Sequence, residues 1–438
     1  MNTKQTIRKL SLFPVTSEVN EKGNLTIGGC DSVSLAEEFG TPLYVFDESS
    51  IRSRCAEFKE EFTSRYPNTT VCYSVKAFMN KALLRIIEEE GLGLDVVSGG
   101  ELSIAHSIGF PMDRVYFPGN NKSTEELKLA LELGIRRIVV DNLHELNMLR
   151  EITGDRRADI LLRLTPGIDP HTHRYHTTGI IDSKFGLTAS TWDEAISTAI
   201  AAPNLNLMGL HFHLGSGIFE VEPYQKAIEV VLKFAADIKQ KYGFELGELD
   251  IGGGIGIQYT LEEEPPPVAA FAELIIREIT NNCRELKLSP PKLIIEPGRA
   301  IIGRAGVALY RAGVVKDIPG IRCYISVDGG MGDNIRHPLY GARHEAVVAN
   351  RVMEKEGEKV TISGKFCEPG DVLIRDINLP PVSAGDIIAI ADCGAYCLPT
   401  ASNYNASLRP AVVLVKAGNA RLIRRRETLE DLARCDLD

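Results

Sequence analysis

Long apolar runs and a surplus of basic residues are both missing from this sequence. No apolar run reaches roughly 18 residues, so the sequence predicts no membrane-spanning helix. The formal net charge of −10 argues against nucleic acid or an anionic membrane as a partner, because clustered basic residues bind such surfaces. Residues 1–15 lack the apolar core of a signal peptide. We therefore expect a globular protein, with small-molecule substrates of either charge still open.

Cysteine and histidine patterns typical of metal sites are also missing. The nine cysteines are odd in number and irregularly spaced, which predicts reduced thiols and a cytoplasmic location. Cys393 and Cys397 are four positions apart, which is not a zinc-site pair by itself. His171, His173 and His176 lie in a proline-bounded loop, at a spacing that fits neither a helical nor a finger-type site. We expect no metal.

What the sequence does contain is a regular alternation of short apolar strands with longer helical segments. The expected strands lie near residues 71–75, 94–97, 115–117, 137–140, 159–164, 207–212, 248–251 and 292–295. Helical patterns between them include residues 80–90, 124–133, 193–201 and 224–242. Eight repeats of strand and helix predict a closed (β/α)8 barrel, and a doubly wound open sheet is the alternative.

The alternation stops near Val307. Strand-like runs then follow one another with little helix, near residues 308–315, 323–327, 345–352, 359–363, 386–391 and 412–422. This pattern predicts a mainly antiparallel β domain, a barrel or sandwich, that also takes in the N-terminal segment. The expected domains are residues 1–40 as that segment, 41–304 as the barrel and 305–438 as the β domain.

Polar and glycine-rich clusters follow nearly every predicted barrel strand. Lys76 follows the first strand and could act as a Schiff-base lysine, although most lysines at strand ends are simply solvated. The other clusters are Ser98–Glu101, Gly119–Asn121, Arg163, His213–Gly217, Gly252–Gly254 and Glu296–Arg299. The C-terminal ends of barrel strands carry active sites, so these clusters predict one catalytic rim.

Three of these clusters suit a phosphorylated aromatic cofactor. Gly252–Gly254 would let backbone N–H groups approach a phosphate, to which Ser216 could add a bond, although a tight turn is the simpler interpretation. Glu296 ends an apolar run and would be desolvated unless paired, for instance with the ring nitrogen of a pyridoxal cofactor. Arg299 offers a planar fork for a carboxylate. His213 could stack on the ring, unless it is merely structural.

In this arrangement the chain resembles the fold-type III pyridoxal-phosphate decarboxylases, and among them the members that act on diaminopimelate. The resemblance covers nearly the whole chain. It rests on an ordered set of motifs: Lys76, Leu92–Leu102, Gly119–Lys122, Asp182–Gly186, Gly252–Gly254, Glu296–Arg299, Asp328–Met331, Cys367-Glu368, Gly394–Tyr396 and Ser402–Asn405.

The resemblance implies a cofactor, pyridoxal 5'-phosphate, and a role for each matching residue. Lys76 would hold the cofactor covalently, His213 would stack on its ring and Glu296 would bind its ring nitrogen. The phosphate contacts would come from Ser216, Gly253, Gly254, Gly298, Arg299 and Tyr396. Asp95 and Arg163 would line the pocket behind the ring.

Substrate recognition and assembly are implied in the same way. Arg299, Arg336 and Tyr340 match the residues that hold a distal carboxylate, and Glu368 matches the acid that takes the distal ammonium. Tyr396 would also contact the substrate. The family forms homodimers in which Cys367 and Glu368 reach the partner's site, so Lys76, His213 and Cys367 are the expected catalytic residues, with either Cys367 or Lys76 returning the proton.

Some positions depart from the family pattern. Gly217 replaces a usual glutamine, Pro369 follows Cys367-Glu368, and the lysine motif ends in Phe78. These departures keep open a decarboxylase of the same fold for a carboxynorspermidine-, ornithine- or arginine-type substrate. Arg336 argues against ornithine. A cofactor-binding protein without catalysis would lack the β domain.

Overall fold

The computed structural model describes residues 8–170, 177–357 and 359–437, which form two compact units. One unit comprises residues 55–256 and 265–298. The other comprises the described parts of residues 1–54, 257–264 and 299–438. His171, His173 and His176, which we expect not to bind metal, lie outside the described residues.

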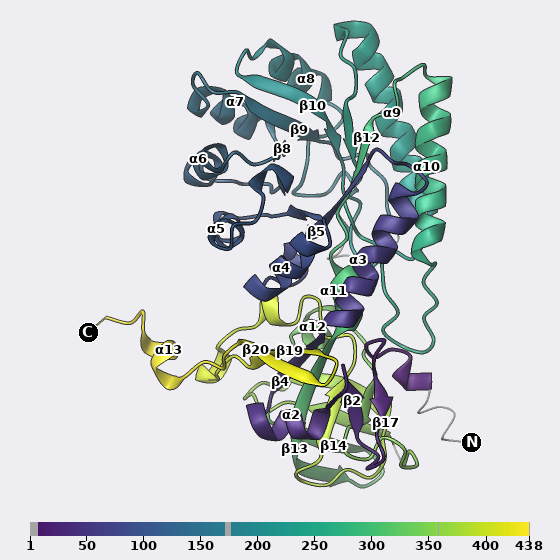
Figure 1. The fold of residues 1–438 in the computed structure, drawn as a ribbon, viewed down its shortest axis with the longest axis vertical. Coiled ribbons are helices and arrows are strands. Elements are labelled where there is room, and N and C mark those ends of the chain that lie inside the picture. Colours follow the sequence, from purple (N-terminus) through teal and green to yellow (C-terminus); the bar gives the residue numbers. More distant parts are fainter. Residues whose placement is uncertain (1–7, 171–176, 358, 438) are drawn as a thin grey trace. The chain divides into compact units, whose positions relative to one another are not determined.

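The first unit is a closed parallel barrel, as the sequence predicts (Figure 1). Around the barrel the strands run in the order β10-β11-β12-β5-β6-β7-β8-β9. Their bounds are β5 Thr69–Ser74, β6 Gly93–Asp95, β7 Val115–Phe117, β8 Arg137–Val140, β9 Ala158–Arg163, β10 Leu205–His211, β11 Glu248–Asp250 and β12 Lys292–Ile295. Every neighbouring pair is parallel, because a helix returns the chain between strands.

Helices ring this barrel in Figure 1. They are α3 Glu48–Thr63, α4 Lys81–Glu89, α5 Gly99–Ser107, α6 Thr124–Leu133, α7 Leu143–Ile152, α8 Trp192–Ala201, α9 Glu222–Tyr242 and α10 Val268–Glu285. Side-chain caps explain several starts: the Ser98, Ser123 and Asn142 side chains accept backbone N–H groups of the first turn. α6 ends at Gly134, whose φ is +62°.

The barrel interior contains an apolar layer of side chains and, nearer the C-terminal ends of the strands, a polar layer. Cys72, Tyr116, Val139, Leu161 and Ile294 form a buried apolar cluster contributed by separate strands. Nearer the C-terminal strand ends, His211 on β10 lies in register with Arg163 on β9 and with Asp250 on β11. Because in-register neighbours on parallel strands project to the same face, the fold itself gathers polar groups at this end of the barrel.

The second unit is built on a mainly antiparallel sheet, also as predicted. Its main path is β17-β16-β14-β13-β4-β19-β20, and β18 and β15 extend it from β13. The bounds are β4 Leu43–Asp47, β13 Gly306–Ile318, β14 Arg322–Val327, β15 Ala346–Val348, β16 Lys359–Ser363, β17 Val372–Asn378, β18 Ile387–Ile390, β19 Ala411–Lys416 and β20 Asn419–Arg424. The unit also contains the short helices α11 Arg299–Ile302, α12 Arg336–Tyr340 and α13 Leu429–Ala433.

Two details of this sheet differ from the sequence prediction. The run predicted at residues 412–422 is two strands, because a turn with positive φ at Ala417 and Gly418 folds β20 back onto β19. The strand β17 was not predicted, since Arg375 and Asp376 interrupt its apolar pattern.

The N-terminal segment packs into the core of the second unit. It contains β1 Glu18–Val19, β2 Leu25–Ile27, β3 Cys30–Asp31 and α2 Ser32–Phe39, which stops at Gly40. Leu25 and Ile27 share a buried cluster with Val307, Val347 and Val413. The domain limits at residues 40 and 304 stay a prediction, and we note that β4, just beyond residue 40, pairs with β13 and β19.

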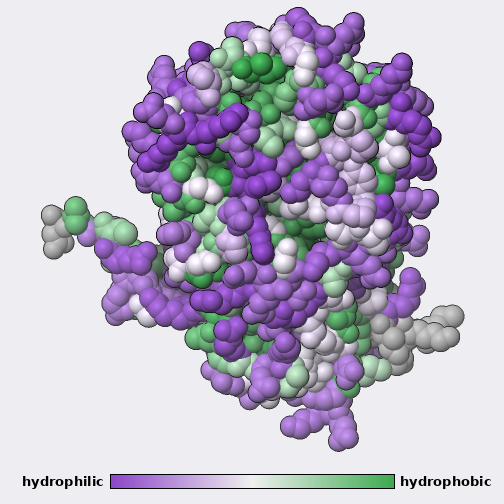
Figure 2. Space-filling view, turned by 45° about the horizontal axis from the view of Figure 1, so that its top comes forward, coloured by the Kyte–Doolittle hydropathy of each residue, from purple (hydrophilic) through white to green (hydrophobic). Residues whose placement is uncertain are grey.

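Hydrophilic residues prevail on the face shown in Figure 2, where hydrophobic residues form small groups between them. Some large apolar side chains are exposed, such as Val15, Ile181 and Ile321. Within the described ranges, no helix is both long and apolar enough to cross a membrane.

Candidate active site

Lys76 lies at the C-terminal end of a barrel strand, where the sequence places it. It occupies a 3-10 turn, Val75–Ala77, directly after β5, and its Nζ lies 3.2 Å from Oδ2 of Asp95. The Lys76 side chain is 37% exposed, whereas that of Asp95 is fully buried. Burial and the nearby Glu296 raise the pKa of Asp95, and Lys76 opposes this rise. The amine is thus held by an ion pair and remains accessible.

Glu296 directly follows β12 and is 3% exposed. Its Oε2 lies 3.5 Å from Nε2 of His211, which is also buried. Burial alone raises the pKa of this carboxyl, but His211 and Lys76 outweigh burial and lower the pKa to about 2. The carboxylate is therefore ionised at neutral pH inside the barrel. Its Oε1 is buried without a hydrogen-bond partner among the described residues.

His213 presents a neutral imidazole in a defined tautomer. Burial first, and then the charges of Lys76 and Arg163, hold its pKa well below the usual range. Its Nδ1 accepts a hydrogen bond from the Gly253 N–H at 3.1 Å, so the ring proton is on Nε2. A Cβ at Gly252, whose φ is +68°, would lie 2.5 Å from that Nδ1. The glycine is therefore what lets the ring approach the loop.

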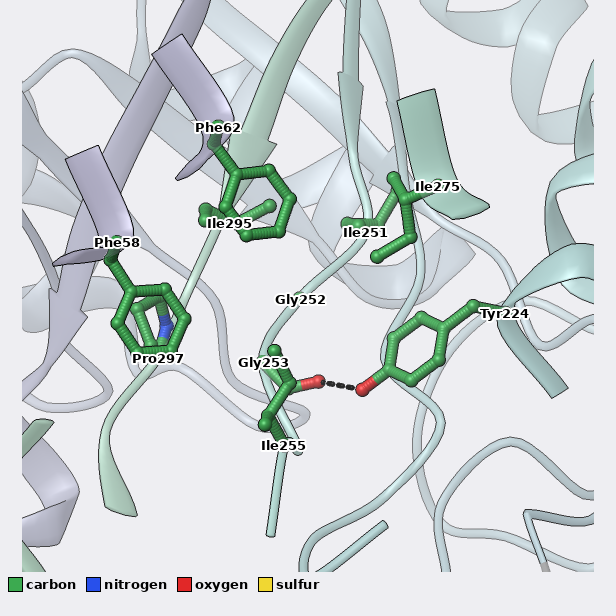
Figure 3. Close-up of a pocket in the computed structure, with 10 residues that line it drawn as sticks. All are labelled: Phe58, Phe62, Tyr224, Ile251, Gly252, Gly253, Ile255, Ile275, Ile295 and Pro297. Atoms are coloured by element: carbon green, nitrogen blue, oxygen red, sulfur yellow. Dashed lines mark hydrogen bonds between the residues drawn. The ribbon is translucent and has the colours of Figure 1, made fainter. Parts of the chain in front are cut away.

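The loop Gly252–Gly254 lies beside an apolar pocket (Figure 3). Phe58, Phe62, Ile275 and Tyr224 line this pocket with the loop itself, and the Tyr224 hydroxyl donates to the Gly253 carbonyl at 2.7 Å. In a trans peptide the C=O and the next N–H point in opposite directions. The N–H of Gly254 therefore points away from Tyr224, as a phosphate-binding N–H would need to.

Close backbone contacts explain the other glycines of the expected phosphate site. A Cβ at Gly254 would lie 2.5 Å from the Gly215 carbonyl oxygen, and one at Gly298 would lie 3.0 Å from that of Ser74. Ser216 follows Gly215 and is half-buried. Side chains are thus excluded where an anion would contact the backbone.

Arg163 is the last residue of the barrel strand β9. It is 6% exposed, and its Nη1 lies 3.5 Å from Oδ1 of Asp141. Its guanidinium lies 4.5 Å from the centre of the Phe185 ring. Gly186 donates its N–H to Oδ2 of Asp141 at 2.8 Å. The motif Asp182–Gly186 therefore packs Phe185 against this arginine and holds its ion-pair partner Asp141 through Gly186.

Two motif segments have structural contacts that account for their residues. Lys122 donates to the carbonyls of Gly119 and Val139 and forms a buried ion pair with Glu145 at 2.9 Å. Glu101 accepts the Val97 N–H, and burial raises its pKa to about 7. These residues shape the turns at the strand ends.

The second unit contains two buried arginines, Arg299 and Arg336, that lie against two tyrosines, Tyr259 and Tyr396. We call these four residues the arginine cluster. Arg299 donates to the Tyr259 hydroxyl at 2.7 Å. The Arg336 guanidinium lies 4.4 Å from the Tyr259 ring centre, and that of Arg299 lies 4.7 Å from the Tyr396 ring centre. Both arginines are under 7% exposed. One tyrosine thus contacts two guanidinium groups, an arrangement suited to an anion.

Tyr396 and Tyr340 are the tyrosines that the sequence analysis assigned to substrate. Tyr396 is half-buried and has a φ of +62°, which is uncommon for a residue with a side chain. Such strain is typical of functional positions. Tyr340 is half-buried at the end of α12, the helix that Arg336 begins.

Cys367 and Glu368 lie in an exposed turn. The Cys367 N–H donates to Oδ1 of Asn405 at 2.9 Å, and the neighbouring Phe366 ring stacks on Tyr404 with 6.0 Å between centres. The turn is thus fixed by the motif Ser402–Asn405. Cys367 and Glu368 are therefore accessible at the surface of this chain.

Sequence reasoning missed four residues of these groups. Tyr259 carries no periodic or motif signal and lies far along the chain from Arg336. Tyr224 lies within a helix pattern. His211 is two positions before His213 on a strand, and Asp250 ends the run before the glycines. The alternation of side chains along β10 could have indicated that His211 points inward with its neighbours.

The barrel groups fit a phosphorylated pyridine ring. We call Lys76, Asp95, His211, His213, Asp250 and Glu296 the barrel cluster. Glu296 offers an ionised, buried and unpartnered oxygen to a protonated ring nitrogen, and the glycine loop leaves room for a phosphate. Lys76 is an amine next to these groups. The donor set can therefore hold a pyridoxal-type cofactor covalently, by its ring nitrogen and by its phosphate.

Comparison with known proteins agrees with this chemistry. Residues 48–303 match the family model described as the pyridoxal-dependent decarboxylase, pyridoxal binding domain. The diaminopimelate decarboxylase of Bacillus subtilis is 46% identical over 426 residues, 96% of this chain and 97% of that protein. The corresponding Synechocystis protein is 44% identical, covering 97% of this chain and 93% of its own. A solved M. jannaschii diaminopimelate decarboxylase in complex with L-lysine has a TM-score of 0.90 at 34% identity, and covers 97% of this chain and 98% of that one.

Proposed function

Since this chain belongs to the diaminopimelate decarboxylase family of pyridoxal-dependent decarboxylases, we propose that it converts meso-2,6-diaminopimelate to L-lysine and carbon dioxide. The reaction is the last step of lysine biosynthesis. Its cofactor is pyridoxal 5'-phosphate. The arginine cluster is the observation that favours this substrate, because two buried guanidinium groups suit a carboxylate that ornithine and arginine lack at their far ends.

The cofactor supplies an electron sink for the electrons released on decarboxylation. Lys76 would hold it covalently, Glu296 would keep its ring nitrogen protonated, and His213 would lie against its ring. Its phosphate would be bound by Ser216, Gly253, Gly254, Gly298, Arg299 and Tyr396. Asp95 and Arg163 would lie behind the ring and balance the buried charge.

The remaining site residues would orient the substrate. Arg299, Arg336 and Tyr340 would hold the distal carboxylate, and Tyr396 would pack beside it. Glu368 would accept the distal ammonium. Binding both ends of the substrate fixes which carboxylate faces the cofactor and lowers the entropy lost on reaching the transition state.

We also propose a homodimer in which each exposed turn completes the partner's site. Cys367 is exposed, and its backbone N–H is hydrogen-bonded to Asn405, as a group that serves a second protomer could be. Either Cys367 or Lys76 would return the proton after decarboxylation. Mixing Lys76→Ala and Cys367→Ala proteins should restore up to about a quarter of wild-type activity if sites are shared. No recovery on mixing would place both residues in one protomer's site.

The substrate proposal is tested by carbon dioxide release with added cofactor. We expect activity on the meso isomer, and none on L,L-diaminopimelate, ornithine, arginine or carboxynorspermidine. Activity on only one of the other amines would keep the fold and cofactor and change the substrate. That result would favour the alternative, a decarboxylase for another basic amino acid, and would direct attention to Gly217 and Pro369.

We propose a cytoplasmic location as well. The odd and irregularly spaced cysteines support it, since secreted proteins usually pair theirs.

A further inference from the structure

Three buried side chains of the barrel cluster come from consecutive strands. His211 ends β10, Asp250 ends β11 and Glu296 follows β12. One nitrogen or oxygen of each lies within 4.8 Å of those of the other two. Their exposures are 1%, 0% and 3%. Two carboxyl groups and one imidazole therefore share a site without solvent.

The hydrogen bonds of this trio are unequal. His211 Nε2 lies 3.5 Å from Glu296 Oε2, and a carboxylate can only accept, so the imidazole donates. Asp250 Oδ1 accepts the Gly252 N–H at 2.9 Å. Asp250 Oδ2 and Glu296 Oε1 have no hydrogen-bond partner in the part of the chain that the structure describes. Glu296 is thus anchored through one oxygen, and its other oxygen is available.

Two carboxylates at this separation cannot both be ionised in a buried site. The charged groups around them are Lys76, Asp95 and Arg163, and the neutral imidazole of His213 and the Cys72 thiol are also nearby. Burial, followed by the charge of Glu296, raises the pKa of Asp250 well above its usual range, whereas that of Glu296 is lowered. Glu296 keeps the negative charge because it is the carboxylate that faces the His211 donor.

We propose that His211 and Asp250 are positioning residues that hold Glu296 as the ionised partner of the cofactor's ring nitrogen. His211 does so by donating to Oε2, which turns Oε1 toward the cofactor. Asp250 does so as an uncharged acid beside it, joined through its Oδ1 to the start of the glycine loop. The inference rests on the cofactor and not on the substrate, so a change of substrate would leave it intact.

The test for His211 compares a variant that loses the donor with one that keeps an N–H donor. His211→Phe should weaken binding of pyridoxal 5'-phosphate to the apoprotein about tenfold or more, since a hydrogen bond to a charged group is lost. His211→Asn should recover part of this affinity. The absorbance spectrum of bound cofactor in His211→Phe should move toward that of Glu296→Gln.

A double-mutant cycle separates positioning from a merely structural role. In a Glu296→Gln background, adding His211→Phe should change neither affinity nor spectrum further, because the carboxylate that His211 positions is gone. Tyr116→Phe is the matched control: it removes a buried hydroxyl from the same barrel interior and should leave both readouts unchanged. An undiminished effect of His211→Phe in the Glu296→Gln background, or a wild-type affinity and spectrum in His211→Phe alone, would overturn the role of His211.

Asp250 is tested by a neutral isostere. Asp250→Asn keeps an acceptor for the Gly252 N–H and carries no charge. Its affinity for pyridoxal 5'-phosphate should therefore stay within about threefold of wild type, and the spectrum of the bound cofactor should not change. Asp250→Ala should weaken binding more, because the Gly252 N–H loses its partner. If Asp250→Asn is as damaging as Asp250→Ala, the residue acts as an anion and its proposed role is wrong. Thermal unfolding of each variant with cofactor confirms that it is folded.

Discussion

The barrel cluster and the arginine cluster hold buried charge in opposite ways. In the barrel cluster, acids gather beside cationic or donor groups, as with Asp95 beside Lys76 and Glu296 beside His211. In the arginine cluster, cations gather and lie against tyrosine rings and a tyrosine hydroxyl. Each device leaves one sign of charge ready for a ligand.

The difference indicates what each cluster is built to receive. An ionised Glu296 with an unpartnered oxygen suits a cationic ring nitrogen. Two buried guanidinium groups beside aromatic faces suit an anion, since the ring attracts the cation without adding a negative charge. If the proposed roles are right, variants of Lys76 should affect the cofactor first, and variants of Arg336 should affect substrate binding first.

The largest effect should come from Lys76, the amine of the barrel cluster. Lys76→Ala should lower kcat by roughly a thousandfold or more and remove the absorbance band of the lysine-bound cofactor near the visible edge. Absorbance spectroscopy and carbon dioxide release check this. A variant that binds cofactor with the wild-type band would disprove the assignment.

The next effect should come from the arginine cluster and should appear in KM. Arg336→Ala should raise KM for meso-diaminopimelate by about 10- to 100-fold, because one charge-assisted contact is worth roughly 1.5–3 kcal/mol. The cofactor spectrum should not change. Arg343→Ala is the control, since Arg343 belongs to the same unit but forms an exposed pair with Glu262. Equal kinetics in the two variants would place the carboxylate contact elsewhere.

A smaller effect tests whether Tyr259 organises the two arginines. Tyr259→Phe removes the hydroxyl that accepts from Arg299 and keeps the ring beside Arg336. We expect KM to rise about threefold to tenfold, and Tyr259→Leu to raise it further because the cation–π contact is lost too. Steady-state kinetics of both variants test this expectation. If Tyr259→Leu and Tyr259→Phe have the same KM, the aromatic ring contributes nothing to substrate binding.

The smallest effect concerns stability and pH. The folded pKa of Glu101 is raised by burial to about 7, above its unfolded value, so the folded state keeps an extra proton and stability is lost as pH rises through about 7. Glu101→Gln cannot ionise, so the wild type should lose stability relative to this variant as the pH rises from about 5.5 to about 8.5. The expected change in the difference between their free energies of unfolding is roughly 1–3 kcal/mol, which is measured through Tm. Thermal melts with saturating cofactor check this. A Tm difference that does not vary with pH would mean that Glu101 is not protonated in the fold.

Elements defined by buried apolar runs could be predicted closely from the sequence. The strands Val115–Phe117, Arg137–Val140 and Lys292–Ile295 have the expected limits, because such runs are short and bounded by polar turns. β17 could not be predicted, because Asp376 adopts a positive φ in the middle of it. Local pattern contains no signal for that bend.

The candidate site divides in the same way. Lys76 and Glu296 could be recognised because each directly follows an apolar strand. The contact of Tyr259 with two arginines could not, since it depends on the folded path of residues 257–264. The same holds for the raised pKa of Asp250, which depends on burial and on the charge of Glu296 beside it. Sequence indicates which groups stand at strand ends, and the fold decides how they share charge.

The strand β4 is synthesised well before the two strands that it pairs with in the folded protein. It lies between β13 and β19 in its sheet, where Val45 pairs with Val307 on one side and with Val413 on the other. At roughly 5–20 residues per second, a ribosome would release β4 some tens of seconds before β19. This early strand must therefore wait with unpaired edges while the whole barrel is made. Chaperone dependence and aggregation of nascent chains should consequently be governed by the N-terminal fifty residues.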